Sequence, residues 1–330
     1  MGEEGRGDEG PGGLGPRYHT PAMRTALAGL GLLSLLLHSA CVSLRPFAEI
    51  RREVPADRFV RVGEQLVHTE QMGAGEPVIL LHGFGGSTYS WRKILPELAR
   101  SHRVVAIDLN GFGFTQRPKD AGSYTREGQE RLVLGVLDAL GIERAHVFGH
   151  SYGGGLSLFI ASRHPERFLS LVLVDSSAPT YANDRRSRAA ALRPLSAFFV
   201  RTVALRPRMI RKALLHSYWD DSLVTPELVQ AYFDRLRIEG VADAYYGLTA
   251  PARDPGPPVV LEKIAIPTLV LWGAHDELIS PAAGRRAAER MPDARFVLIE
   301  NSGHVPMEET PGEVLREALP FLESHRGGRP

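Results

Sequence analysis

From about residue 58, short runs of consecutive apolar residues alternate with longer segments in which apolar residues recur at helical spacing. A continuous apolar run such as 78–81 is typical of a parallel strand that is buried on both faces. The segment 89–100 that follows it places Trp91, Ile94 and Leu98 on one stripe of a helix. This alternation predicts an α/β fold with a doubly wound, mostly parallel sheet and helices on both of its faces.

The same pattern gives the expected elements of the core. The runs 59–62 and 65–70 predict a hairpin across Gly63-Glu64. Further strands are expected at 78–81, 104–107, 146–148, 171–174, 269–272 and 296–299, and helices at 89–100, 125–140, 156–162, 282–291 and 312–324. These elements assign residues 58–177 and 263–330 to the core.

One long interval interrupts the alternation. Between Asp175 and Leu269 lie over ninety residues that are largely helical in pattern and contain no convincing central strand. Such a length is too great for a loop in a compact domain, so we expect 178–262 to form a helical insertion over the sheet. Residues 185–212 of this insertion hold nine basic residues and no acidic one. That segment is either a basic amphipathic surface for an anionic membrane or a helix that packs its apolar stripe on the core.

The first 57 residues precede the core and have a different character. Residues 1–22 are rich in Gly, Glu and Arg and predict a disordered leader. Residues 23–44 begin with Met23-Arg24 and continue without an acidic or basic charge, which predicts a signal peptide or a membrane anchor. Residues 45–57 are expected to be a linker. Either reading of 23–44 predicts a membrane-tethered protein on the extracytoplasmic side.

The end of this apolar run resembles a bacterial lipoprotein signal. In such signals a cysteine is lipidated after cleavage, and here Ser39-Ala40 precedes Cys41. The sequence departs from the pattern at His38, where an aliphatic residue is usual. A lipoprotein, an uncleaved signal-anchor and an ordinary cleaved signal therefore all remain open.

Composition excludes several classes of protein. With 43% hydrophobic and 23% charged residues, the chain is neither disordered throughout nor a multi-pass membrane protein. A formal net charge of +1 gives no electrostatic reason to expect a nucleic-acid partner. The single cysteine, Cys41, excludes an internal disulfide, and the twelve histidines show no metal-ligand spacing, so we expect neither a metal nor a cofactor.

The chemistry is expected to begin at Gly149-His150-Ser151-Tyr152-Gly153. This G-x-S-x-G sequence follows the strand 146–148 and precedes an apolar helix, which is the context of a nucleophile elbow. The glycines allow the tight approach of backbone segments that such a turn requires. We therefore predict that Ser151 is a nucleophile, with an exposed Gly/Ser turn as the alternative.

A nucleophilic serine needs a base and a group that orients the base. Asp276 and His304 lie in loops after the strands 269–272 and 296–299, and sites in open α/β sheets form at such strand ends. We predict His304 as the base and Asp276 as its orienting acid. Alternatives for the acid are Asp175 and Glu277.

Two other histidines are expected to have structural roles. His150 is predicted to pack with its side chain pointing away from the substrate. His82 is predicted to be a hydrogen-bonded loop residue. The loop His82-Gly83-Phe84-Gly85-Gly86 follows a strand and can present backbone N–H groups to a ligand. We expect the N–H groups of Phe84 and Tyr152 to form the oxyanion hole.

Together these stretches resemble the α/β-hydrolase superfamily over residues 58–177 and 263–326. The resemblance is carried by HGFGGS at 82–87, DLNGFGFTQRP at 108–118, GHSYGG at 149–154, WGAHDELIS at 272–280 and NSGHVPMEE at 301–309. It implies a sheet of the α/β-hydrolase type and a helical cap at 178–262 that shapes the substrate pocket. The order Ser, Asp, His is also that of this superfamily.

Within the superfamily, the chain resembles capped serine hydrolases of the esterase and lipase type. The stretches HGFGGSTYSW and DLNGFG also look like those of epoxide hydrolases and haloalkane dehalogenases, whose aspartate nucleophile is replaced here by Ser151. Hydrolases of carbon–carbon bonds in ring-fission products are similar too, but they usually have asparagine before the serine, where this chain has His150.

The expected function is hydrolysis of a carboxylic ester with an apolar part, through an acyl-enzyme. The alternatives are a carbon–carbon bond hydrolase and a non-catalytic, tethered binding module. A dinucleotide site at Gly83-x-Gly85 is disfavoured because Thr88 stands where its third glycine would fall. The expected partners are a small-molecule ester and, through the N-terminal segment, a membrane; the sequence indicates no particular protein partner.

Overall fold

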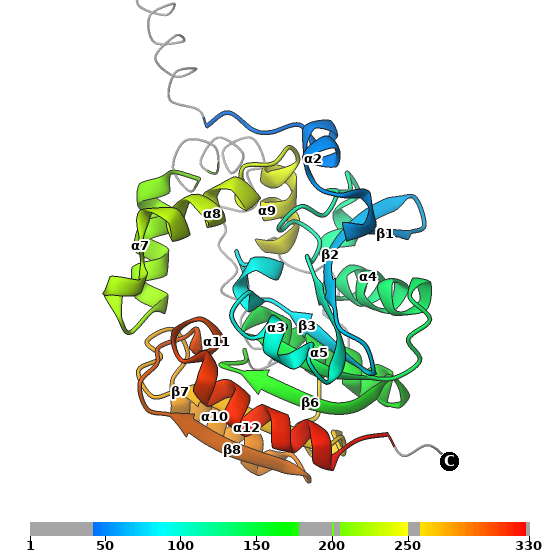
Figure 1. Ribbon diagram of the computed structural model, residues 1–330, viewed down its shortest axis with the longest axis vertical. Coiled ribbons are helices and arrows are strands. Elements are labelled where there is room, and N and C mark those ends of the chain that lie inside the picture. Colours follow the sequence, from blue (N-terminus) through cyan, green and yellow to red (C-terminus); the bar gives the residue numbers. More distant parts are fainter. Residues whose placement is uncertain (1–41, 178–199, 201–204, 250–257, 328–330) are drawn as a thin grey trace, which may run out of the picture. The chain divides into compact units, whose positions relative to one another are not determined.

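The computed structural model describes residues 42–177, 200, 205–249 and 258–327 (Figure 1). The predicted leader at 1–22, most of the predicted signal or anchor at 23–44, and most of the basic segment at 185–212 lie outside these ranges. Within the described ranges, no helix has both the length and the apolar character needed to cross a membrane.

The core is one sheet of eight strands in the order β1-β2-β4-β3-β5-β6-β7-β8. Its strands are β1 (Phe59–Val62), β2 (Gln65–Met72), β3 (Glu76–Leu81), β4 (His102–Ile107), β5 (Ala145–His150), β6 (Phe168–Val174), β7 (Thr268–Gly273) and β8 (Ala294–Ile299). The pairs β1–β2 and β2–β4 are antiparallel, and all other pairs are parallel. The predicted fold class, a mostly parallel sheet of the α/β-hydrolase type, is confirmed.

Helices cover both faces of this sheet. They are α2 (Phe47–Glu53), α3 (Leu95–Leu98), α4 (Arg126–Ala139), α5 (Tyr152–Arg163), α7 (Pro207–Ser217), α8 (Pro226–Leu236), α9 (Val241–Thr249), α10 (Pro281–Arg290), α11 (Pro306–Glu309) and α12 (Pro311–Ser324). Ile79 and Leu81 of β3 belong to one apolar core with α4, α5 and α10. Val78 and Leu80 belong to a second core with α3 and α12. Successive residues of a strand point to opposite faces, so β3 is buried on both sides.

Two expected segments differ from the structure. The single helix expected at 89–100 is a 3₁₀ turn (Thr88–Trp91) followed by the short α3. Pro96 has no N–H to donate, and this removes a hydrogen bond that a continuous helix would require. The segment 45–57, expected to be a linker, contains α2 with a buried Ile50. Its Arg45 forms an isolated parallel β-bridge with Ile238.

The described parts of the insertion 178–262 form α7, α8 and α9, and these parts contain no strand. Ile210 and Leu214 of α7, together with Leu228 and Val229 of α8, are buried in the same apolar core as α3 and α12. The cap, defined here as the described residues 205–249, therefore packs on the core through a continuous apolar cluster.

Candidate active site

Ser151 lies at the junction of β5 and α5 with a backbone φ of 49°. Space at this turn is limited by backbone atoms. A Cβ on Gly153 would lie 2.2 Å from the carbonyl oxygen of Leu81, and a Cβ on Gly149 would lie 2.6 Å from the Cα of Gly154. The glycines flanking Ser151 therefore permit the turn that directs it outward from the strand.

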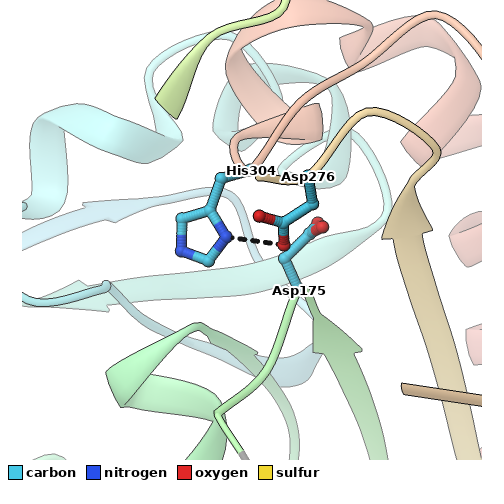
Figure 2. A group of neighbouring side chains, drawn as sticks. All are labelled: Asp175, Asp276 and His304. Atoms are coloured by element: carbon cyan, nitrogen blue, oxygen red, sulfur yellow. Dashed lines mark hydrogen bonds and ion pairs between the residues drawn. The ribbon is translucent and has the colours of Figure 1, made fainter. Parts of the chain in front are cut away.

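His304 and Asp276 come from loops that follow β8 and β7 (Figure 2). His304 Nδ1 lies 2.8 Å from Asp276 Oδ2, and both residues are buried. Asp276 Oδ1 accepts from the backbone N–H groups of Leu278 and Ile279 at 2.8 and 3.0 Å. Burial raises the pKa of Asp276, but the hydrogen bond from His304 and the charge of that ring outweigh burial, so the pKa lies below its usual value. The carboxylate is thus held ionised against the imidazole.

Ser151 and His304 both line one cavity of about 430 Å³. The cavity lies between core loops and the cap helices α7 and α8. Its other lining residues are Gly83, Phe84, Gly85, Gly86, Ser90, His150, Met209, Ile210, Ala213, Leu214, His216, Ser217, Tyr232, Leu236, Leu278 and Val305. Ser151 and His304 both lie in the described part of the chain, and no hydrogen bond joins their side chains there. Such a bond often tightens only when substrate is bound.

Of the two residues expected to supply backbone donors, Phe84 lines the cavity, and Tyr152 directly follows Ser151 in the chain. Phe84 belongs to a turn in which the Gly86 N–H donates to the Gly83 carbonyl at 3.0 Å, and its ring is half exposed at the cavity. Tyr152 is the first residue of α5, so its N–H is at the N-terminal end of that helix. The two rings meet edge to face with centroids 6.4 Å apart.

The alternatives for the orienting acid occupy different places. Glu277 is exposed and lies near His216, with 3.4 Å between Oε2 and Nδ1. Asp175 is fully buried next to Asp276, and its Oδ1 accepts from the Gly273 N–H at 2.9 Å. Of the three acids, Asp276 is the one whose carboxylate is hydrogen-bonded to His304.

His82 has the environment of a structural loop residue. Its Nδ1–H donates to the Gly83 carbonyl at 2.8 Å, and its Nε2 accepts from the Leu109 N–H at 3.1 Å. Burial lowers the pKa of His82, so the ring is neutral in this pairing.

His150 differs from the expectation that its side chain points away from the site. It lines the cavity, and its Nε2–H donates to the backbone carbonyl of His304 at 2.7 Å. Burial, followed by repulsion from His304, lowers the pKa of His150 to about 3. A neutral His150 therefore supports the His304 loop through this hydrogen bond. The position of His150 next to Ser151 in the sequence did not indicate this contact.

Two further residues of the site, Glu308 and Glu309, were not anticipated. Glu309 Oε2 accepts from the Gly303 N–H at 2.6 Å, and its Oε1 accepts from the N–H groups of Trp219 and Asp220 at 2.6 and 3.0 Å. The His304 N–H donates to the carbonyl of Ser217 at 2.7 Å. The His304 loop is therefore joined directly to the segment of the cap that follows α7.

Glu308 makes the second connection to the cap. It is fully buried, it pairs with Arg92, and it accepts from the hydroxyl groups of Tyr218 and Tyr232. The Tyr232 hydroxyl also lies 3.1 Å from Ser90 Oγ at the cavity. The one sequence signal for these contacts was a pair of acids directly after the apolar residues of NSGHVPMEE.

The family described as alpha/beta hydrolase fold matches residues 76–311. The chain therefore belongs to the α/β-hydrolase superfamily, and the predicted resemblance is confirmed. It is similar to 2-hydroxy-6-oxo-2,4-heptadienoate hydrolase of Pseudomonas putida, with 30% identity over 266 residues, 77% of this chain and 92% of that one. It is also similar to Lipase 3 of a Moraxella species, with 30% identity over 270 residues, 79% of this chain and 82% of that one.

A solved structure gives the same fold. The meta-cleavage product hydrolase of Pseudomonas fluorescens IP01 superposes with a TM-score of 0.68 at 25% identity, covering 81% of this chain and 98% of the other. Fold and comparisons together support a hydrolase. They do not distinguish among the bonds that hydrolases of this fold cleave.

Proposed function

We propose that this protein is a serine hydrolase that cleaves carboxylic esters with an apolar acyl or alcohol part. The observation that carries the proposal is the 2.8 Å hydrogen bond between His304 Nδ1 and Asp276 Oδ2 on the cavity that Ser151 also lines. Nucleophile, base and orienting acid are the three groups that this chemistry requires. Similarity of the chain to Lipase 3 of a Moraxella species supports an ester as the substrate.

In the proposed mechanism, Ser151 Oγ attacks the ester carbonyl carbon while His304 takes the hydroxyl proton on Nε2. Asp276 holds the ring through Nδ1–H and stabilises the imidazolium. The N–H groups of Phe84 and Tyr152 donate to the oxyanion of the tetrahedral intermediate. The intermediate collapses, His304 returns the proton to the leaving alcohol, and the acyl group remains on Ser151. A water molecule then attacks the acyl carbonyl carbon while His304 takes its proton. His304 passes this proton to Ser151 Oγ as the bond from that oxygen to the acyl carbon breaks, which releases the acid and restores the serine.

The cavity walls support a substrate with an apolar part. Met209, Ile210 and Leu214 of α7 line one side, and Leu236 and Leu278 line others. Burying one methylene of a substrate against such walls contributes about 0.8 kcal/mol, so activity should rise with acyl length until the cavity is filled.

Hydrolysis of a carbon–carbon bond in a ring-fission product is the second candidate. Similarity to the heptadienoate hydrolase and to the meta-cleavage product hydrolase favours it as much as similarity to the lipase favours an ester. Both candidates use Ser151 and His304, so substrate comparison must separate them.

The deciding experiment measures kcat/KM for p-nitrophenyl esters of increasing acyl length, for monoacylglycerols and for 2-hydroxy-6-oxo-2,4-heptadienoate. A preference for the esters is expected, and a preference for the dienoate would establish the second candidate instead. Ser151→Ala should lower kcat by on the order of a millionfold. Labelling by a fluorophosphonate should be lost in Ser151→Ala and retained in Ser162→Ala, an exposed serine of α5. Absence of labelling and of turnover in the unaltered protein would indicate a binding module.

A further inference from the structure

Asp175 lies directly beside the carboxylate that holds His304. It follows β6, is fully buried, and belongs with Asp276 and His304 to a group whose polar atoms lie within 4.8 Å of one another. Figure 2 shows its carboxyl beside that of Asp276. Its Oδ1 accepts from the Gly273 N–H, but its buried Oδ2 has no hydrogen-bond partner among the described residues. A buried polar atom in that condition requires an explanation.

The charges around the two carboxyls are unequal. Asp276 is compensated by the His304 ring and by two backbone N–H groups on Oδ1. Asp175 has one backbone N–H and no cation in hydrogen-bond contact within the described part of the chain. Burial in the first place, and repulsion from Asp276 in the second, raise the pKa of Asp175 well above its usual value. Two neighbouring carboxyls in a buried site share one proton for the same reason.

We propose that Asp175 is protonated on Oδ2 and that this O–H donates a hydrogen bond to the carboxylate of Asp276. Asp175 is then a positioning residue of the catalytic group. The proton gives Asp175 Oδ2 the partner that it lacks. It also adds a donor to the carboxylate that orients His304. The role in catalysis rests on the proposed function, whereas the location of the proton does not.

The backbone supplies a nearly isosteric test of this proposal. Asp175 has a φ of 44°, in the left-handed region that Asn tolerates as well as Asp. In Asp175→Asn, the amide oxygen can still accept from the Gly273 N–H, and the amide nitrogen can donate to Asp276. The variant therefore reproduces a protonated aspartate and does not reproduce an ionised one.

The first measurement locates the proton without using activity. Infrared difference spectra between the unaltered protein and Asp175→Asn at neutral pH should show the carbonyl stretch of a protonated carboxylic acid in the unaltered protein only. No such band, with Asp175→Asn folded as judged by thermal unfolding, would overturn the proposal. This result stands even if no ester is hydrolysed, so it separates failure of the proposal from failure of the proposed function.

The second measurement compares kcat/KM across pH on the preferred substrate. Asp175→Asn should keep activity within about threefold and leave the acid limb of the profile in place, because one donor to Asp276 is lost and one is gained. Asp175→Ala removes the donor, concentrates charge on Asp276 and stabilises the protonated base. Its acid limb should move upward by roughly half a unit to one unit, the effect of one hydrogen bond.

Two outcomes would contradict the positioning role. A loss of a hundredfold or more in Asp175→Asn, or a downward move of its acid limb, would show that Asp175 is ionised. An unchanged acid limb in a folded Asp175→Ala would show that Asp175 does not act on His304 through Asp276. Because Ala is strained at a positive φ, thermal unfolding of both variants is measured alongside.

Discussion

The backbone at Ser151 occupies a region that most residues avoid, and the surrounding residues maintain it. Its N–H donates to the Val174 carbonyl at 3.0 Å, and its own carbonyl accepts from the N–H groups of Gly154 and Ser177 at 3.0 Å each. Fixed contacts of this kind are what allow strain of about 1–3 kcal/mol to persist at a functional residue. The turn therefore depends on the small residues around it more than on Ser151 itself.

Gly153→Ala tests that dependence. The new Cβ would lie 2.2 Å from the Leu81 carbonyl oxygen and 2.6 Å from that of His82, and backbone atoms cannot move aside cheaply. We expect a loss of about 3 kcal/mol in the free energy of unfolding, seen as a fall in Tm of roughly 5 °C or more. Gly312→Ala is the control, because nothing lies within 4 Å of its Cβ. Equal Tm values for the two variants would contradict the steric argument.

The division of roles between the acids is tested at Asp276. Asp276→Asn keeps the shape of the side chain but favours the wrong tautomer of His304, so kcat should fall by roughly 10⁴-fold, by analogy with the corresponding change in another serine-hydrolase fold. Glu277→Gln should leave kcat nearly unchanged, since this side chain is exposed and faces His216. The reverse ranking, read from steady-state kinetics, would transfer the orienting role to Glu277.

At the scale of elements, local signals predicted the sheet well. Continuous apolar runs such as 78–81 and 171–174 mark buried strands because a strand covered on both faces needs apolar residues at every position. The loops that carry Ser151, Asp276 and His304 follow such strands, so their meeting at one edge could be inferred from their order. Local signals failed at Pro96, where a missing N–H divides the expected helix.

Contacts between the cap and the core could not be predicted, because they join residues far apart in the sequence. The hydrogen bond from the Trp219 N–H to Glu309 spans 90 residues, and so does the one from Tyr218 to Glu308. Neither partner shows a pattern that identifies the other. The support of His304 by His150, across 154 residues, was missed for the same reason.

Glu309→Gln tests the connection between the cap and the His304 loop. The carboxylate accepts four hydrogen bonds, from Trp219, Asp220, Ser302 and Gly303. A glutamine would turn two donor hydrogens toward existing donors, and hydrogen bonds to charged groups contribute about 1.5–3 kcal/mol each. We expect a lower Tm and a loss in kcat of at least about tenfold, because His304 loses its fixed position.

The control for this substitution is Glu323→Gln, an exposed acid of α12 that pairs with Arg326. It should change neither Tm nor kcat measurably, since exposed ion pairs contribute little. If Glu309→Gln behaved like Glu323→Gln in both measurements, the cap would not position the His304 loop.

At the scale of the whole molecule, the site is built where the carboxyl ends of four adjacent parallel strands meet. Ser151, Asp175, Asp276 and His304 follow β5, β6, β7 and β8, which are neighbours in that order in the sheet. Gathering these polar groups requires burying them, and other histidines are buried elsewhere in the core, His102 and His146 near the first residues of β4 and β5. The stability of the protein must therefore depend on pH.

Four buried histidines determine the direction of this dependence. Burial is the largest cause that lowers the pKa of His82, His102, His146 and His150, and for His150 the value is about 3. Below about pH 6.5 the unfolded chain takes up protons on these side chains, while the folded protein does not. The free energy of unfolding should therefore fall as pH decreases from 6.5, over a window that extends to about 3 for His150.

Two buried carboxyls act on this balance in opposite directions. The raised pKa of Asp175 contributes stability at low pH that is lost as pH rises above about 4, whereas the lowered pKa of Asp276 contributes stability above about 4 that is lost on acidification. Between pH 7.5 and 5, Asp276 is ionised in both the folded and the unfolded chain and adds no slope. Asp175 is ionised in the unfolded chain over this range while its raised pKa favours the protonated form in the folded chain, so it reduces the slope that the four histidines produce.

The whole-molecule prediction is measured by denaturant unfolding between pH 7.5 and 5. At pH 5, His150 alone should account for a loss of about 2 kcal/mol, since its unfolded pKa lies about 1.5 units above that pH. His150→Gln retains a donor for the His304 carbonyl and removes the titrating ring. The loss in free energy of unfolding between pH 7.5 and pH 5 should therefore be smaller by about 2 kcal/mol in this variant. His216→Gln, at an exposed side chain, is the matched control for the substitution itself. A slope that is the same in His150→Gln and in the unaltered protein would show that His150 is charged in the folded state, and the hydrogen bond that supports His304 would then need a different assignment.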